Sequence, residues 1–446
     1  MLEQALYREA LSKIEIANCK GRVCQQRSVH DARAAAGFAH DEHRRGRSTI
    51  ARSSEKVAHL GDPLPHARRA YDYFEARLLC RLVKVALTHP YSWPEVRRGA
   101  ERIVVDTARV LAARGHDVTV FTAGSQPGRE WNRSVRVVTF RRMFRNPYRH
   151  ERWFGWRVLP NLVVGRFDVV HSFMPNDALA AVRARRLTGN RTVYDEMGIP
   201  LPSWWASQPN RKVRTRLVAE VDVYGCMSCH ALAALERECG RTGALIPGGV
   251  RLSEFQPAAA REQHPTLLFS GKVDEPRKGV AVLLRALALL AEWEPDVHLW
   301  LSGPGDAKPL LAAAPPTAQE RTEVLPIGEP RTQADRYGRA WVTVLPSTHD
   351  SFGLVLLESL ACGTPIVVAN HAAPPELVTP ETGALSEPED PVSLAEAIRA
   401  ALDLSRRRET ATACRSFARR FDWDEGIAPL LEQLYASEAL PSAALP

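Results

Sequence analysis

The stretch WVTVLPSTHDSFGLVLLESLACGTPIVVAN, residues 341–370, places a strand, a loop, a helix and a second strand in close succession. Residues 341–345 are apolar and rich in β-branched side chains, which is typical of a buried strand. A helix is predicted over 353–361, because an apolar run follows Asp350 and ends at Cys362-Gly363. A further strand is predicted over 364–368. Strands that alternate with helices favour a parallel, doubly wound sheet.

The same alternation extends outward over most of the chain and is interrupted once. The polar segment 256–265, which ends in Pro265, predicts a linker. We therefore predict an α/β fold of two Rossmann-like, doubly wound parallel-sheet domains facing a central cleft. The predicted boundaries are a poorly ordered N-terminal extension at 1–81, a first domain at 82–255, the linker, a second domain at 266–423, and a C-terminal helix and tail at 424–446, the helix crossing back to the first domain.

Composition narrows the class of protein. The net charge is +8, of which five positive charges fall in residues 1–82, so the body is only mildly basic and nucleic acid is not an expected partner. Eight scattered cysteines and the lack of a secretory pattern predict a cytoplasmic protein, with the inner face of the cell membrane as one expected location. Cys226 and Cys229 form a CxxC without a well-spaced fourth ligand, so we expect small core residues rather than a metal site.

The loop GKVDEPRKG, residues 271–279, follows a predicted strand and precedes a predicted helix. Two of only eight lysines in the chain, Lys272 and Lys278, lie in it. A helix N-terminus and ammonium groups both suit a diphosphate, whose charge they stabilise as it leaves. A solvated basic loop would show the same residues, so this segment alone leaves both interpretations open.

The loop after the strand at 341–345 adds two carboxylates. Asp350 is expected as the helix N-cap, and Gly353 lets the backbone approach a ligand. Glu358 lies about two helical turns on and shares a face with Asp350 at greater depth. We expect Asp350 to hold hydroxyls of a transferred sugar and Glu358 to accept from ribose. Taken alone, Glu358 would also fit an ordinary exposed helix glutamate.

The segment 350–370 resembles the donor site of retaining, GT-B-fold glycosyltransferases of the large family four, and the wording DEPRKG is similar to bacterial phosphatidylinositol mannosyltransferases. Asp350 and Lys272 replace the usual Glu and Arg, and Pro375-Glu376 also fits the family pattern. The resemblance implies that no metal or other cofactor is needed and that the leaving phosphate assists front-face attack. It implies a nucleotide-sugar site made of Gly271, Gly303, Ser351, Phe352, Gly353, Leu354 and Glu358, with Lys272, Lys278 and Asp350 as catalytic residues.

The acceptor side departs from the family pattern in two places. Arg98-Gly99 resembles the family's Gly-Gly loop, with Arg98 in place of the first glycine. The sequence DVVHSF, residues 168–173, keeps His171 but has Phe173 where the family often has a second histidine beside the sugar. We expect His171 to play mainly a packing role.

The segment 140–157 interleaves six arginines with six aromatic residues and is predicted to be a loop. It suits an anionic membrane surface or a lipid-linked acceptor. Single-stranded nucleic acid could use the same residue types. The remaining interpretation is a loop that packs its aromatic rings and solvates its arginines.

These features predict an enzyme that moves a hexose from a GDP- or UDP-linked sugar to a hydroxyl of a glycan, lipid or small molecule, with retention of configuration. Two alternatives stay open. A sugar-nucleotide 2-epimerase on the same fold would need further acid and base residues in the first domain. A non-catalytic sugar-nucleotide-binding protein would fit the loss of the second histidine.

Overall fold

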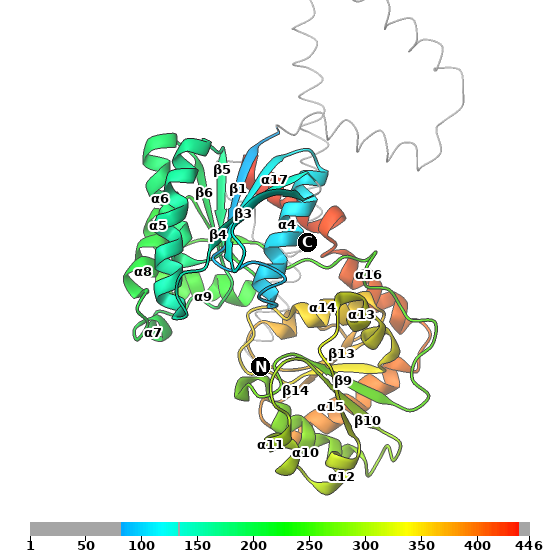
Figure 1. The fold of residues 1–446 in the computed structure, drawn as a ribbon. Helices are drawn as coiled ribbons and strands as arrows, with labels where there is room; N and C mark the ends of the chain where they lie inside the picture. The colour runs from blue at the N-terminus through cyan, green and yellow to red at the C-terminus, as the bar shows by residue number, and fades with distance from the viewer. Residues whose placement is uncertain (1–81, 133, 437–446) are drawn as a thin grey trace, which may run out of the picture. The chain divides into compact units, whose positions relative to one another are not determined.

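The computed structural model describes residues 82–132 and 134–436, which fold into two α/β domains with separate sheets (Figure 1). The predicted extension at 1–81 lies outside the described residues. The central strands of both sheets are short, apolar and buried along most of their length, as expected where helices cover the two faces, whereas the edge strands Gly128–Asn132 and Thr322–Leu325 are not buried.

The first sheet has the order β3-β4-β2-β1-β5-β6-β7-β8 among the described residues. Its strands are β1 Lys84–Thr88, β2 Asp117–Gly124, β3 Gly128–Asn132, β4 Val135–Arg141, β5 Val169–Ser172, β6 Arg191–Glu196, β7 Val223–Cys226 and β8 Ala244–Leu245. Its helices are α4 Gly99–Ala113, α5 Pro147–Gly165, α6 Pro175–Thr188, α7 Pro202–Trp205, α8 Arg211–Glu220 and α9 Cys229–Cys239. A core of aromatic and aliphatic side chains lies where α5 and α6 pack against this sheet.

The first sheet is parallel, as predicted, except at one edge. β3 pairs antiparallel with β4, with Trp131 opposite Arg136. Ser134, whose φ is 75°, helps the chain reverse between these strands. All other strand pairs in the described residues are parallel, so the carboxyl ends of β1, β2, β5 and β6 share one edge.

The second sheet has the order β11-β10-β9-β12-β13-β14 in the described part of the chain. Its strands are β9 Thr266–Ser270, β10 His298–Ser302, β11 Thr322–Leu325, β12 Val342–Leu345, β13 Ile366–Ala369 and β14 Gly383–Ser386. Its α-helices are α10 Val280–Leu290, α11 Lys308–Ala312, α12 Pro316–Glu320, α13 Pro330–Arg339, α14 Leu354–Ala361, α15 Pro391–Ser405 and α16 Thr410–Arg419, with short 3₁₀ turns at η1 Pro276–Lys278 and η2 Pro374–Leu377.

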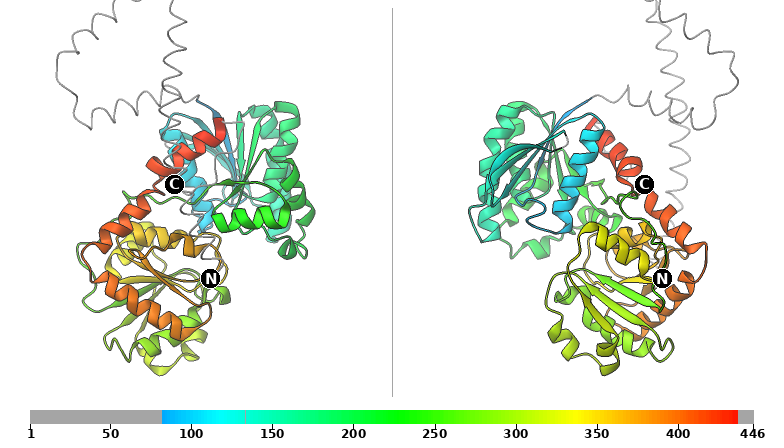
Figure 2. Two further views of the ribbon diagram at one scale, coloured as in Figure 1. Left: turned by 180° about the vertical axis from the view of Figure 1, so that it is seen from behind. Right: turned by 45° about the vertical axis from the view of Figure 1, so that its right-hand side comes forward.

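The last described elements are a π-helical turn, η3 Trp423–Ile427, and α17 Ala428–Ala436. Glu432 accepts two hydrogen bonds of 2.7 Å from Arg114, at the end of α4. Figure 2 shows α17 beside α4 in both views. The C-terminal helix therefore contacts the first domain, although it follows the second in sequence.

Candidate active site

Lys278 and Asp350, two of the three predicted catalytic residues, are joined directly. The Lys278 ammonium donates to both Asp350 oxygens at 2.8 Å, and each side chain is 14% exposed. The residues are far apart in sequence but meet because η1 follows β9 and the Asp350 loop follows β12, and these strands are neighbours. The pair is largely shielded from solvent, so a ligand that reaches it meets two opposite charges held in fixed positions.

Close backbone packing brings the two loops together. Gly279, at φ 74°, lies so near Pro346 that a Cβ on it would be 2.3 Å from the Pro346 carbonyl oxygen. Only glycine fits there, since any side chain would clash with backbone. Arg277 strengthens the junction by donating to the His349 carbonyl oxygen at 2.5 Å and to Asp350 at 3.3 Å.

Lys272 lies apart from that pair. Its ammonium is 3.3 Å from Asp274, and its side chain is 55% exposed. The backbone N–H of Gly271 donates to the Ser302 carbonyl at 2.9 Å, which places Gly271 beside Gly303 at the carboxyl ends of β9 and β10. The structure thus groups Gly271, Lys272 and Gly303 at one sheet edge.

The segment 351–354 forms the start of α14, and it corrects the expected cap. Gly353, at φ 99°, is the N-cap residue, whereas Asp350 lies before the helix and pairs with Lys278. Ser351 donates to the Met197 carbonyl oxygen at 2.8 Å, and the buried Phe352 ring packs against Phe421 at 5.9 Å. Asp350 lies three residues before the N-cap, and its carboxylate accepts from the Lys278 ammonium instead of from the helix N–H groups.

Glu358 is buried rather than exposed, and its partner comes from α4. Arg102 donates to Glu358 Oε1 at 2.5 Å, and the two side chains are 22% and 11% exposed. Burial raises the pKa of Glu358, and the Arg102 charge acts against this rise. Because Asp350 is outside the helix, the two carboxylates do not share a helical face. Sequence reasoning missed Arg102, and no local pattern marks it as the partner.

The acceptor-side loop meets the donor-side helix. A Cβ on Gly99 would lie 3.1 Å from Leu354 Cδ1, so the start of α4 abuts the start of α14. Arg98 is the N-cap residue of α4 without a capping side-chain bond; its guanidinium instead donates to Glu101 at 2.5 Å. The Arg98 side chain is 62% exposed. The positive charge of Arg98 therefore lies at the N-terminus of α4, at the position where the family pattern has a glycine.

His171 and Phe173 are in the core of the first domain. Their rings stack with centroids 4.4 Å apart, and both are 1% exposed. His171 Nδ1 is 2.8 Å from the Tyr435 hydroxyl of α17. Burial lowers the pKa of His171 to about 3, so the ring is neutral. These contacts agree with a packing role for His171.

The segment 140–157 is not a loop, which corrects that expectation. It contains the end of β4, a short connection and the first half of α5. Asn146 caps the helix by accepting from the Arg149 N–H at 3.0 Å, and Pro147 follows at the first helical position. The Asn-Pro pair was the sequence signal that could have located this start.

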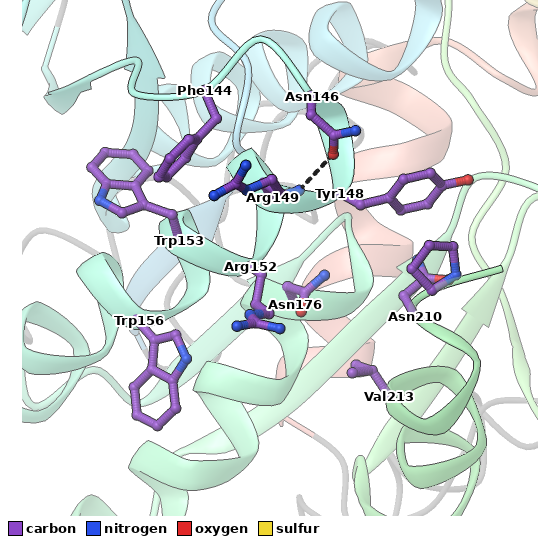
Figure 3. Close-up of a pocket in the computed structure, with 11 residues that line it drawn as sticks. Phe144, Asn146, Tyr148, Arg149, Arg152, Trp153, Trp156, Asn176, Asn210 and Val213 are labelled. Atoms are coloured by element: carbon purple, nitrogen blue, oxygen red, sulfur yellow. Dashed lines mark hydrogen bonds between the residues drawn. The ribbon is translucent and has the colours of Figure 1, made fainter.

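A cavity of about 550 Å³ opens where α5, α6 and α8 begin (Figure 3). Figure 3 shows Arg149, Arg152 and Asn176 in the middle of the group, with Trp153 and Trp156 on one side and Tyr148 and Asn210 on the other. Phe154 is fully buried, while Trp156 is 58% exposed. The segment therefore divides its aromatic rings between the core and the surface.

The hydrogen-bond partners of Glu376 also become clear only in the structure. Its carboxylate accepts from the backbone N–H groups of Cys229 and His230 at 2.9 and 2.6 Å, at the start of α9. Burial raises the pKa of Glu376 to about 7, although the two N–H groups lower it.

Cys226 is buried in β7 and Cys229 begins α9. In the described residues, no group of three or more His, Cys, Asp or Glu side chains is arranged to hold a metal ion.

Comparison with known proteins identifies the class of this protein. The model of "Glycosyltransferase Family 4" matches residues 97–254, and that of "Glycosyl transferases group 1" matches residues 264–403. Sucrose-phosphate synthase from Thermosynechococcus elongatus has a similar structure, with a TM-score of 0.69 at 23% identity over 80% of this chain and 98% of that one. The fold is GT-B, two parallel-sheet α/β domains.

Individual proteins of known function are also similar to this chain in sequence. A phosphatidyl-myo-inositol mannosyltransferase of Mycobacterium tuberculosis is 29% identical over 385 residues, which are 80% of this chain and 97% of that protein. A D-inositol 3-phosphate glycosyltransferase of Xylanimonas cellulosilytica is 35% identical over 42% of this chain and 50% of that protein. The chain belongs to glycosyltransferase family four. It is a sugar-transferring enzyme, and retention of configuration is consistent with that family.

Proposed function

We propose that this enzyme transfers a hexose from a nucleoside diphosphate sugar to a hydroxyl group of an anionic, lipid-linked acceptor. The observation that carries the donor half is the Lys278–Asp350 pair beside the start of α14. It offers a cation for a diphosphate and a carboxylate for sugar hydroxyls within one hydrogen bond of each other.

On this proposal the donor displaces the Lys278–Asp350 contact. The ammonium turns to the diphosphate, and Asp350 accepts from the sugar that is transferred. The exposed Lys272 adds a second positive charge, and the N–H groups at the start of α14 add a partial one. We propose that these groups, with no metal ion or other cofactor, stabilise the charge on the leaving diphosphate.

Glu358 takes the ribose in this proposal. Arg102 donates to its Oε1, and the Tyr337 hydroxyl also lies close to the carboxylate. The remaining acceptor capacity of the carboxylate binds ribose hydroxyls. The nucleotide is a GDP or UDP group. The Anabaena neighbour Alr3699/HepE, at 18% identity and a TM-score of 0.63, was crystallised with UDP-glucose, which makes UDP-glucose a suitable first donor to test.

The acceptor half rests on the cavity at the start of α5. Arg149 and Arg152 supply charge for a phosphate, and the partly exposed Trp156 supplies an apolar surface. The names of the mannosyltransferase relatives point to a phosphatidylinositol acceptor in those proteins. We propose that the segment 140–157 docks on anionic lipid at the inner face of the cell membrane. No helix in the described ranges is both long and apolar enough to span a membrane.

The test is donor cleavage. The full chain is incubated with UDP-glucose or GDP-mannose, without acceptor, and released nucleoside diphosphate is measured; vesicles containing phosphatidylinositol are then added. We expect slow release with one donor and faster release with the vesicles. Binding of a donor with no release under either condition would instead support a non-catalytic sugar-nucleotide-binding protein.

A further inference from the structure

A second basic cavity lies in the first domain, away from the loops that carry the donor and acceptor residues. It has a volume of about 420 Å³ and opens between the second half of α5 and the strands β2, β3 and β4. Because α5 connects the parallel strands β4 and β5, it begins near their carboxyl ends and finishes near their amino ends. Substrates of such folds bind at the carboxyl ends, so this cavity is separate from the proposed donor and acceptor sites.

The lining of this cavity carries charge of one sign. Among the described residues that line it are Lys84, Arg129, Arg136 and Arg157, and no aspartate or glutamate. Alternation along β3 contributes to this, because Arg129 faces the cavity whereas its neighbour Glu130 points to the other face of the sheet. Like charges gathered without a counter-charge repel one another, so the lining favours a bound anion.

Lys84 already has a structural role. Its ammonium donates to the Gly165 carbonyl oxygen at 2.8 Å and lies 5.2 Å from the centre of the Phe167 ring. Gly165 is the last residue of α5, where helix carbonyl groups lack partners within the helix. Lys84 therefore satisfies the helix end, and the three arginines are the cations left for a ligand.

The three arginines have donors that the protein does not use. The guanidinium groups of Arg129, Arg136 and Arg157 make no hydrogen bond or ion pair with any described residue. Two of them lie on aromatic rings instead, Arg136 at 4.9 Å from the centre of Trp131 and Arg157 at 5.0 Å from that of Phe140. A guanidinium stacked on a ring still presents its N–H groups at its edge, so these donors are oriented and available.

Strand register brings two of the arginines together. Arg129 pairs with Val138 across β3 and β4, and Arg136 is two residues before Val138, so the two arginines are diagonal neighbours on one face of the sheet. Thr119 lies opposite Arg136 in the β2–β4 pair and also lines the cavity, and its buried Oγ1 has no partner. Covered hydroxyl groups normally find partners, so the wall of the cavity has further hydrogen-bonding capacity that the protein does not use.

We propose that this cavity binds a ligand that carries several phosphate charges, separately from the sugar donor. Guanidinium groups bind phosphate oxygens in pairs, and three of them from different elements suit more than one phosphate. A soluble polyphosphate compound and the headgroup of an anionic lipid share this chemistry. The inference goes beyond the proposed function and does not depend on it. Arg157 ends the segment 140–157, but Arg129 and Arg136 lie outside that segment.

The test is isothermal titration calorimetry with linear tripolyphosphate. The full chain carries Lys272→Ala and Lys278→Ala, which remove the two donor-side ammonium groups. We expect Arg136→Gln and Arg157→Gln, each added to this chain, to weaken binding about tenfold or more, since each removes charge-assisted hydrogen bonds. Arg399→Gln is the matched control, because Arg399 lies 4.8 Å from the centre of the Trp293 ring in the second domain, and it should leave binding unchanged.

Co-sedimentation with phosphatidylcholine vesicles, with and without phosphatidic acid, separates the two sources of phosphate. Less pelleting of Arg136→Gln with the acidic vesicles would assign the site to a lipid headgroup, and unchanged pelleting would assign it to a soluble compound. Thermal unfolding checks that the variants are folded. The inference is overturned if tripolyphosphate does not bind, or if folded Arg136→Gln and Arg157→Gln bind it as tightly as Arg399→Gln does. Donor cleavage by the wild-type chain tests the proposed function separately, and its failure would leave this inference intact.

Discussion

The buried Arg102–Glu358 pair yields the sharpest prediction about donor binding. Glu358→Gln keeps the size of the side chain and removes its charge. Hydrogen bonds to charged groups contribute about 1.5–3 kcal/mol, and each 1.4 kcal/mol is tenfold in affinity. With the Glu358 side chain 11% exposed, little of this is screened by water. We therefore expect nucleoside diphosphate to bind about 10- to 100-fold more weakly, measured by isothermal titration calorimetry.

The exposed Arg97–Glu329 ion pair provides a matched control for the buried Arg102–Glu358 pair. Glu329 accepts from Arg97 at 2.9 Å, but these side chains are 68% and 44% exposed. Exposed ion pairs contribute about 0–1 kcal/mol, so Glu329→Gln should leave nucleotide affinity within twofold of wild type. Glu358→Gln should also lower the free energy of unfolding by about 1–3 kcal/mol, because it leaves Arg102 buried beside a neutral group. A folded Glu358→Gln variant with wild-type nucleotide affinity would refute the ribose assignment.

Three further predictions concern catalysis, pH and the membrane. Lys278→Ala should lower the rate of donor cleavage by about 10²–10³-fold without unfolding the protein. The control Lys308→Ala, which changes an exposed lysine on α11, should leave that rate unchanged. Equal rates for Lys278→Ala and wild type would show that Lys278 is not a site residue. Burial raises the pKa of Glu376 from its ordinary 4.5 to about 7, so between these pH values the folded state holds a proton that the unfolded state has lost. The free energy of unfolding should therefore fall as pH rises from about 4.5 to 7. Urea unfolding of Glu376→Gln should not show this fall, and equal pH slopes for variant and wild type would contradict the prediction. Arg141→Glu with Arg145→Glu should reduce co-sedimentation with anionic vesicles and leave donor cleavage unchanged, because each basic residue contributes about 1 kcal/mol near such a surface; undiminished pelleting would count against docking through this segment.

Much of the local structure could be predicted because its causes lie within a few residues. The predicted strand at 341–345 contains β12, and the predicted strand at 364–368 overlaps β13. The predicted helix at 353–361 differs from α14 only at its first residue. The prediction of a loop over 140–157 was wrong, although the Asn146-Pro147 pair is a local signal for the start of a helix.

Partners across long sequence separations were decided by tertiary structure alone. The sequence indicated Lys278, Asp350 and Glu358 as site residues, but it could not show that Lys278 would hold Asp350 or that Arg102 would reach Glu358. Local propensity depends on backbone and neighbouring side chains, whereas these contacts depend on which strands become neighbours and how closely loops pack. The same is true of Glu376, whose carboxylate accepts from the backbone N–H groups at the start of α9, about 146 residues earlier in the chain.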